Sequence, residues 1–305
     1  MTIDACIGPI AVLDSGLGGL TVVDALRRTL PAEDLLYFGD TAHLPYGNKS
    51  ALTVTRCVRR IIHFLLPHKP RHVVIACNTA TALALPAIRA EFPNLSISGV
   101  IEPGARAAVV AAGAKPVPLI GVIATEATIR SKAYERAILR RRSMAHVMLR
   151  PTPLLVPMIE EGRTGDDPIV EQVLRQYLRG MILRGVDVLV LGCTHYPILR
   201  DAIANVLGER VHLIDSARQC AQDIARRLGR DCPINRLAAP ARTAGGSLRT
   251  FVTDDVWRFT TLASRFLGTR IDPPTLVQLP QLCADDADMA ADAAADTAVA
   301  LRAIA

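Results

Sequence analysis

The stretch RHVVIACNTATALALPAI, residues 71–88, decides the fold of this chain, because a related stretch, VDVLVLGCTHYPIL, occurs at residues 186–199. Each begins with a short apolar run and continues with a small residue, a cysteine and two polar residues before a helix-like segment. An apolar run without alternation is typical of a strand buried on both faces, as in the parallel sheet of an α/β protein. The repeated pattern therefore predicts a duplicated unit of strand, cysteine turn and helix.

The cysteines of the two stretches, Cys77 and Cys193, are predicted to lie just beyond the carboxyl ends of their strands. In open α/β sheets, ligands bind outside these ends. A single cysteine in this position is more often a buried apolar residue than a nucleophile. Two such cysteines, 116 positions apart and each followed by a polar pair, Asn78-Thr79 or Thr194-His195, instead favour two thiols that face one cleft.

The composition is that of a globular protein. Its 305 residues are 50% hydrophobic, which is enough for two domains with sizeable cores. Aromatic residues make up 4% and the net charge of +6 is scattered, so we expect no nucleic-acid surface. Seven cysteines, odd in number and without a C-x-x-C pair, are typical of a reducing compartment. With no secretory pattern and no long apolar span, the sequence predicts a cytoplasmic protein without a membrane segment.

A glycine-rich turn follows the first predicted strand, residues 10–13, and begins at Asp14. It is not a dinucleotide-binding turn, because Thr21 stands where that motif needs its third glycine and Asp14 would repel a pyrophosphate. Backbone amides at such a turn suit a carboxylate ligand instead.

Two later segments carry further candidates. The loop GDTAHLPYGNKS, residues 39–50, follows the second predicted strand and contains Tyr46 and Gly47. The segment PTPLLVPMIEEG, residues 151–162, places Glu160 and Glu161 on a short helix, where a solvated surface pair is the alternative to a catalytic role. A single helix is predicted over residues 125–139, a strand over 96–100 that ends in IEPGA, and a helix after residue 251 with Asp254 as its N-cap.

Two thiols on opposite sides of a ligand suit the removal of an α-proton from one face of a carbon and the return of a proton to the other. A free cysteine, with a pKa of about 8.5, is mostly protonated at neutral pH, so each thiol needs a proton acceptor. Asp14 could serve Cys77, and His195 could serve Cys193 with support from Glu160. Donors that hold a substrate carboxylate are expected from Ser15, Asn78, Thr79 and Thr194.

Seven segments of the chain resemble glutamate racemases, of the cofactor-independent aspartate/glutamate racemase superfamily: LDSGLGGLTV, YFGDTAHLPYG, ACNTATA, GVIEPG, LVPMIEEG, LGCTHYPIL and LASRFLG. The resemblance covers nearly all of residues 10–268. It implies an α/β fold of two pseudo-symmetric Rossmann-like domains with mainly parallel sheets and the active site in the cleft between them. Residues 1–100 and 212–283 would form the first domain and residues 101–211 the second, with 284–305 as an acidic tail rich in alanine and aspartate.

The resemblance also implies roles for individual residues. The catalytic residues would be Cys77 for the D-isomer and Cys193 for the L-isomer, assisted by Asp14, Glu160 and His195. The substrate-binding residues would be Asp14, Ser15, Tyr46, Gly47, Asn78, Thr79, Thr194 and His195. The implied reaction interconverts L- and D-glutamate for peptidoglycan synthesis and needs no cofactor, neither pyridoxal phosphate nor a metal. We expect a small-molecule substrate, a homodimer, and no nucleic-acid or membrane partner.

Three alternatives remain open from the sequence. The same fold could serve an aspartate or hydantoin racemase, or a decarboxylase, although the decarboxylase needs only one thiol. The set Cys77, Cys193, His195 and Asp14 could hold the metal of a hydrolase, for which Cys-x-His is a poor zinc spacing. Finally, the cleft could bind an amino acid without turning it over, or the protein could act on a macromolecular partner.

Overall fold

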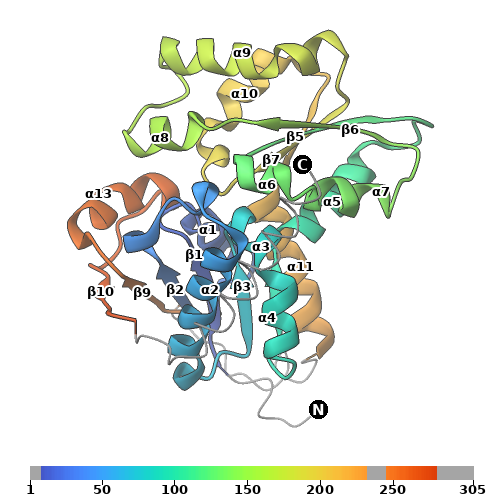
Figure 1. Cartoon of the computed structure of the whole chain (residues 1–305). Helices are drawn as coiled ribbons and strands as arrows, with labels where there is room; N and C mark the ends of the chain where they lie inside the picture. The colour runs from blue at the N-terminus through green and yellow to red at the C-terminus, as the bar shows by residue number, and fades with distance from the viewer. Residues whose placement is uncertain (1–7, 232–244, 280–305) are drawn as a thin grey trace, which may run out of the picture.

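The computed structural model describes residues 8–231 and 245–279, and these form two β-sheets with helices on their faces (Figure 1). The six-stranded sheet has the order β10-β9-β2-β1-β3-β4, and the four-stranded sheet the order β6-β5-β7-β8. Every strand pair in both sheets is parallel. The predicted α/β class is therefore confirmed, whereas the predicted acidic tail lies outside the described residues.

The six-stranded sheet has the first cysteine stretch near its centre. Its strands are β1 (Ile10–Asp14), β2 (Leu35–Gly39), β3 (His72–Ile75), β4 (Ile97–Gly99), β9 (Leu248–Val252) and β10 (Thr275–Leu276). In β1, Leu13 pairs with Phe38 of β2 and with Ile75 of β3. Because these strands are parallel and in register, Asp14 and Cys77 both lie at the carboxyl edge of the sheet.

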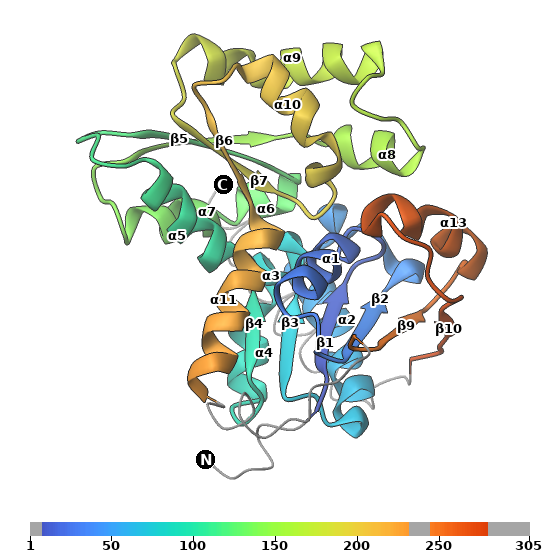
Figure 2. The ribbon, with the colours of Figure 1, turned by 180° about the vertical axis from the view of Figure 1, so that it is seen from behind.

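Residues of β1 alternate between two helical layers. Ile10 and Val12 pack with apolar residues of α1 (Leu20–Thr29), whereas Ala11 and Leu13 pack with those of α2 (Ala51–Leu65). Figure 2 shows α1 and α11 (Ser216–Asp231) side by side in front of the strands. A strand covered on both faces needs an apolar residue at every position, which explains the uninterrupted apolar run.

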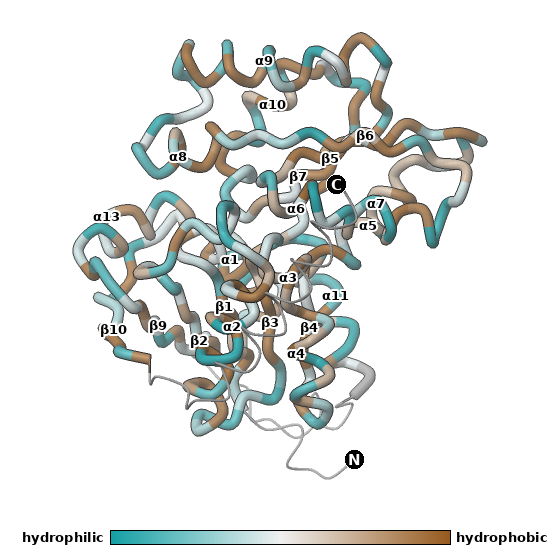
Figure 3. The backbone as a smooth tube through the Cα atoms, in the orientation of Figure 1, coloured by the Kyte–Doolittle hydropathy of each residue, from teal (hydrophilic) through white to brown (hydrophobic). Residues whose placement is uncertain are grey.

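The four-stranded sheet contains the second cysteine stretch. Its strands are β5 (Leu119–Ala124), β6 (His146–Pro151), β7 (Val188–Gly192) and β8 (His212–Asp215). Val188 and Val190 pack towards α5 (Ile101–Ala111) and α7 (Ala133–Leu139), whereas Leu189 and Leu191 pack towards α9 (Pro168–Leu183). The hydropathy colouring in Figure 3 shows the apolar run of β5 and β7 between these more polar helices.

The remaining helices connect the strands. They are α3 (Asn78–Leu83), α4 (Leu85–Glu91), α6 (Glu126–Arg130), α8 (Leu155–Glu160), α10 (Arg200–Leu207) and α13 (Val256–Leu267), with 3-10 turns η2 (Thr41–His43), η3 (Tyr46–Asn48), η4 (Leu66–His68) and η5 (Tyr196–Leu199). No described helix combines the length and the apolar character that a membrane crossing requires.

Three local predictions were wrong. The helix predicted over residues 125–139 is broken into α6 and α7, because Lys132 adopts a left-handed conformation with φ of 52°. The segment IEPGA begins α5 instead of ending a strand, with Ile101 as its first residue. The N-cap of α13 is Asp255 and not Asp254, since the Asp255 carboxylate accepts a hydrogen bond from the Arg258 amide at 2.9 Å.

The division into domains stays a proposal. We propose that each sheet is the centre of one domain, as predicted. The point at which the chain re-enters the first domain, however, lies after the predicted residue 212. Strand β8 pairs with β7, so His212–Asp215 belongs to the four-stranded sheet. The return to the first domain then begins with α11, which packs against α1.

Candidate active site

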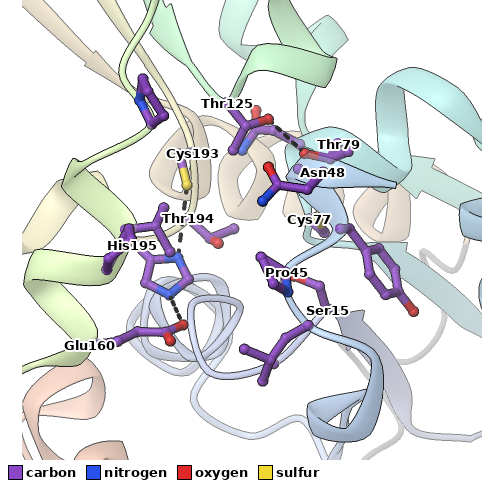
Figure 4. A pocket seen from close by; sticks show the side chains of 18 of the residues that line it. Ser15, Pro45, Asn48, Cys77, Thr79, Thr125, Glu160, Cys193, Thr194 and His195 are labelled. Atoms are coloured by element: carbon purple, nitrogen blue, oxygen red, sulfur yellow. Dashed lines mark hydrogen bonds and ion pairs between the residues drawn. The ribbon is translucent and has the colours of Figure 1, made fainter. Parts of the chain in front are cut away.

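A cavity of about 280 Å³ lies between the carboxyl edges of the two sheets. Both cysteines of the repeated stretches line it, and Figure 4 shows Cys77 and Cys193 on opposite sides. The cavity also contains nearly all of the predicted site residues: Ser15, Tyr46, Gly47, Asn78, Thr79, Glu160, Thr194 and His195. Asp14 is fully buried behind this lining and does not itself line the cavity.

Cys77 is held at the start of α3. It is the N-cap residue, and its Sγ accepts a hydrogen bond from the Ala80 amide at 3.5 Å. Burial, together with the negative charge of Asp14, raises the pKa of the Cys77 thiol to about 12. This cysteine is therefore protonated at neutral pH unless a base takes its proton.

Asp14 is a buried carboxylate whose charge acts on Cys77. Its Oδ2 accepts a hydrogen bond from the Gly16 amide at 3.1 Å, whereas its Oδ1 is buried without a hydrogen-bond partner. Burial raises the pKa of Asp14, against the positive charge of His195 and the hydrogen bonds of nearby amides. A buried carboxylate with a free acceptor and a raised pKa is suited to accept a proton.

Cys193 belongs to a chain of polar groups on the opposite wall (Figure 4). Its Sγ lies 3.8 Å from Nδ1 of His195, and Nε2 of His195 lies 3.1 Å from Oε1 of Glu160. Arg258 of α13 is the next group, with Nη2 at 3.6 Å from Oε2 of Glu160. Burial lowers the pKa of His195, but the hydrogen bonds and negative charges of Cys193 and Glu160 outweigh it and raise the pKa to about 10.

Only one of the two adjacent glutamates at the end of α8 takes part in this chain of polar groups. Glu160 forms the contact with His195 and is 12% exposed at its side chain. Glu161 also lines the cavity but is an exposed residue. The structure therefore places Glu160, and not Glu161, next to the histidine.

Gly18 packs closely against the cavity wall that carries Cys193, and there is no room for a side chain at this position. A Cβ at this position would lie 2.2 Å from Oγ1 of Thr194 and 2.5 Å from Nδ1 of His195. In the same turn, the Thr21 hydroxyl donates to the backbone carbonyl of Thr194 at 3.0 Å. The glycine-rich turn thus packs directly against the segment that follows Cys193, and any larger side chain at Gly18 would displace it.

Two tyrosine hydroxyls make buried hydrogen bonds at the cavity wall, and one of them orients a polar group of the cavity. The Tyr134 hydroxyl donates to Oδ1 of Asn78 at 2.7 Å, whereas Nδ2 of Asn78 is buried without a partner. The hydroxyl of Tyr46 donates to Oδ2 of Asp40 at 2.6 Å, so it is engaged outside the cavity. An oriented amide with a free N–H donor is well suited to bind a carboxylate oxygen.

Sequence reasoning missed two cavity residues that join the halves of the site. Oγ1 of Thr125 lies 2.9 Å from Oγ1 of Thr79, which links the carboxyl end of β5 to α3. Thr125 follows a strand of the parallel sheet as its first polar residue, so the rule that singled out the two cysteines could have found it. Arg258 reaches the site from α13, and no local pattern of the sequence indicates this.

A family model described as Asp/Glu/Hydantoin racemase matches residues 10–224, which include both cysteines and the histidine that follows the second one. The chain belongs to this racemase family.

Individual members of the family are similar over most of their length. The glutamate racemase of Koribacter versatilis is 44% identical over an alignment of 282 positions, and this alignment covers 86% of this chain and 94% of the relative. The crystal structure of glutamate racemase isoform RacE1 from Bacillus anthracis has a TM-score of 0.82 at 37% identity and covers 90% of this chain and 99% of its own.

A second solved relative carries a ligand. The glutamate racemase of Francisella tularensis, in complex with D-glutamate, has a TM-score of 0.80 at 35% identity and covers 91% of this chain and 99% of its own.

Proposed function

We propose that this protein is a glutamate racemase, which interconverts L- and D-glutamate by proton transfer at the α-carbon. The observation that carries the proposal is the presence of Cys77 and Cys193 on opposite sides of one cavity, each beside a buried proton acceptor. The names of the similar proteins, and the D-glutamate bound by the Francisella tularensis relative, support glutamate as the substrate.

In the direction from L-glutamate, Cys193 is the base. His195 takes the thiol proton, and Glu160 stabilises the imidazolium that forms, so the thiolate is available to remove the α-proton. Cys77, which its surroundings keep protonated, then gives a proton to the opposite face of the carbon. The product is D-glutamate, with Cys193 protonated and Cys77 left as the thiolate.

In the direction from D-glutamate, the roles are exchanged. Cys77 must lose its proton before it can act, and the free Oδ1 of Asp14 is the acceptor for it. Cys193 is then the acid, with its proton supplied through His195. Exchange of thiol protons with solvent resets the enzyme after each turnover.

The deprotonated intermediate carries negative charge on its α-carboxylate. We assign its stabilisation to hydrogen-bond donors from both walls, namely Ser15, Asn78, Thr79 and Thr194, with Tyr46 and Gly47 completing the substrate site. General acid/base help contributes about 10² to 10⁴-fold, so these donors in a closed cavity must supply much of the remaining rate enhancement.

We further propose that the D-glutamate formed supplies peptidoglycan synthesis and that the enzyme acts in the cytoplasm. The four cysteines of the described residues, Cys57, Cys77, Cys193 and Cys220, are free thiols, and this supports a reducing compartment. We also propose a homodimer, which size-exclusion chromatography with light scattering would test: a mass of one chain contradicts it.

Circular dichroism of an L-glutamate solution tests the activity itself. We expect the signal to decay to zero after the purified protein is added, because the racemic mixture has none, and to do so from D-glutamate as well. A signal that stays constant, together with saturable glutamate binding, would instead support an amino-acid binding protein.

The same assay with L-aspartate separates the racemase alternatives. Faster decay with aspartate than with glutamate would contradict the proposed substrate.

A further inference from the structure

A second group of reactive side chains lies outside the cavity, behind the wall that Tyr46 forms. One ligand atom each of Asp40, His43 and Cys57 lies within 4.8 Å of the other two. Asp40 follows β2 and His43 ends η2, whereas Cys57 comes from the second turn of α2. Within residues 8–231 and 245–279, it is the only group of three such residues that are this close together.

The group is built around a buried carboxylate. Asp40 is fully buried, and its Oδ1 lies 2.8 Å from Nδ1 of His43 and accepts a hydrogen bond from the Thr253 hydroxyl at 2.9 Å. Cys57 is 5% exposed, so its thiol is buried beside this carboxylate. A cation that binds the three side chains displaces the thiol proton, because a cysteine ligand binds a metal as the thiolate.

The ligand types select the cation. A thiolate, an imidazole and a carboxylate together are the donor set of zinc and of similar divalent ions, whereas magnesium and calcium prefer oxygen ligands alone. In a tetrahedral site with metal–ligand distances of about 2.0–2.3 Å, ligand atoms lie about 3.3–3.8 Å apart. The atoms of this group lie between 2.8 Å, for Asp40 and His43, and at most 4.8 Å apart, so small side-chain shifts bring the three into this range.

Solvent access is available from one side of the group. The side chain of His43 is 38% exposed and belongs to a three-residue turn, so it can adjust its position and admit an ion. The exposed side also leaves room for water as a fourth ligand.

From this arrangement we propose that Asp40, His43 and Cys57 form a binding site for a zinc-type divalent cation. The site is connected to the cavity wall, because Oδ2 of the same Asp40 holds the Tyr46 hydroxyl at 2.6 Å. Metal binding and the position of Tyr46 thus depend on one carboxylate.

Cobalt titration tests the proposal with a signal that reports the sulfur ligand. Chelator-treated full-length protein is titrated with Co²⁺, and the thiolate-to-cobalt charge-transfer absorption in the near ultraviolet is followed. We expect one equivalent to bind with this absorption, which zinc then abolishes by displacement. Absence of the absorption in the unaltered protein overturns the proposal.

Variants locate the bound ion, because Cys193 with His195 could also give a cobalt–thiolate signal. Cys57→Ser should remove the absorption, and His43→Gln should weaken binding at least about tenfold, the lower end of what even an indirect partner of a metal ligand contributes. Cys220→Ser, which changes a buried thiol of α11, is the matched control and should retain it. Absorption that persists in Cys57→Ser and disappears in Cys193→Ser would place the ion in the cavity and overturn the proposal.

Discussion

Replacement of Glu160 by glutamine tests the chain of groups behind Cys193. Glutamine keeps the shape and can still accept a hydrogen bond from Nε2 of His195, but it removes the negative charge 3.1 Å from that atom. Hydrogen bonds to charged groups contribute about 1.5–3 kcal/mol and neutral ones about 0.5–1.5 kcal/mol, so the change costs about 1–1.5 kcal/mol of imidazolium stabilisation. At 1.36 kcal/mol per factor of ten, kcat/KM should fall about 5- to 13-fold.

The pH profile gives a second readout of the same change. Because Glu160 contributes to the raised pKa of His195, its neutralisation lowers that pKa from about 10. For D-glutamate, where His195 supplies the proton of Cys193, the alkaline limb of the kcat/KM profile should therefore move to lower pH.

Circular dichroism assays from both isomers measure these effects, with Glu161→Gln as the matched control. The control should behave as the unaltered enzyme, since Glu161 is exposed and Glu160 alone contacts the histidine. Equal losses in the two variants, or an unshifted alkaline limb in Glu160→Gln, would refute the role given to Glu160.

Three further predictions follow from other parts of the structure. Cys77→Ser and Cys193→Ser should each abolish racemisation in the circular dichroism assay but retain glutamate binding by calorimetry, because serine is a much weaker acid; near-normal turnover in either contradicts the two-base mechanism. Gly18→Ala should lower kcat/KM strongly, because the added Cβ would meet the segment after Cys193. Gly180→Ala is the control and should not lower it, because a Cβ there has its nearest contact at 3.9 Å. Equal activities of the two variants would exclude the packing role of Gly18. Burial lowers the pKa of His72 to about 4, so the unfolded state binds a proton here before the folded state does, and the fold loses about 3 kcal/mol of stability as the pH falls from 6.5 towards 4. Urea unfolding of His72→Gln should show a weaker loss of stability over this range, and an unchanged pH dependence would be inconsistent with it.

The central strands and both cysteines could be predicted because continuous burial leaves a direct trace in the sequence. Val73, Val74 and Ile75 are fully buried, as are Leu189 and Val190, and no other pattern satisfies a strand with helices on both faces. The cleft followed from the rule that parallel strands present their carboxyl ends at one edge.

The contacts between distant elements of the site could not be predicted, because they depend on how the two sheets are placed and no short segment encodes this. The contact of Arg258 with Glu160 joins residues of α13 and α8, and the Thr79–Thr125 contact joins α3 to the end of β5. The break at Lys132 was missed for a different reason: the residues around it have ordinary helix propensity, and the local hydrogen bond from the Ala133 amide to Oγ of Ser131 at 3.2 Å appears only in the structure.

Racemisation of L-glutamate in deuterated water tests the two-thiol mechanism most directly. With separate bases on the two faces, the D-glutamate formed early should carry solvent deuterium at the α-carbon, while the L-glutamate that remains still carries its original proton. Magnetic resonance of the two isomers after separation measures both. D-glutamate that retains the substrate proton, or deuterium that enters both isomers equally from the start, would contradict the mechanism.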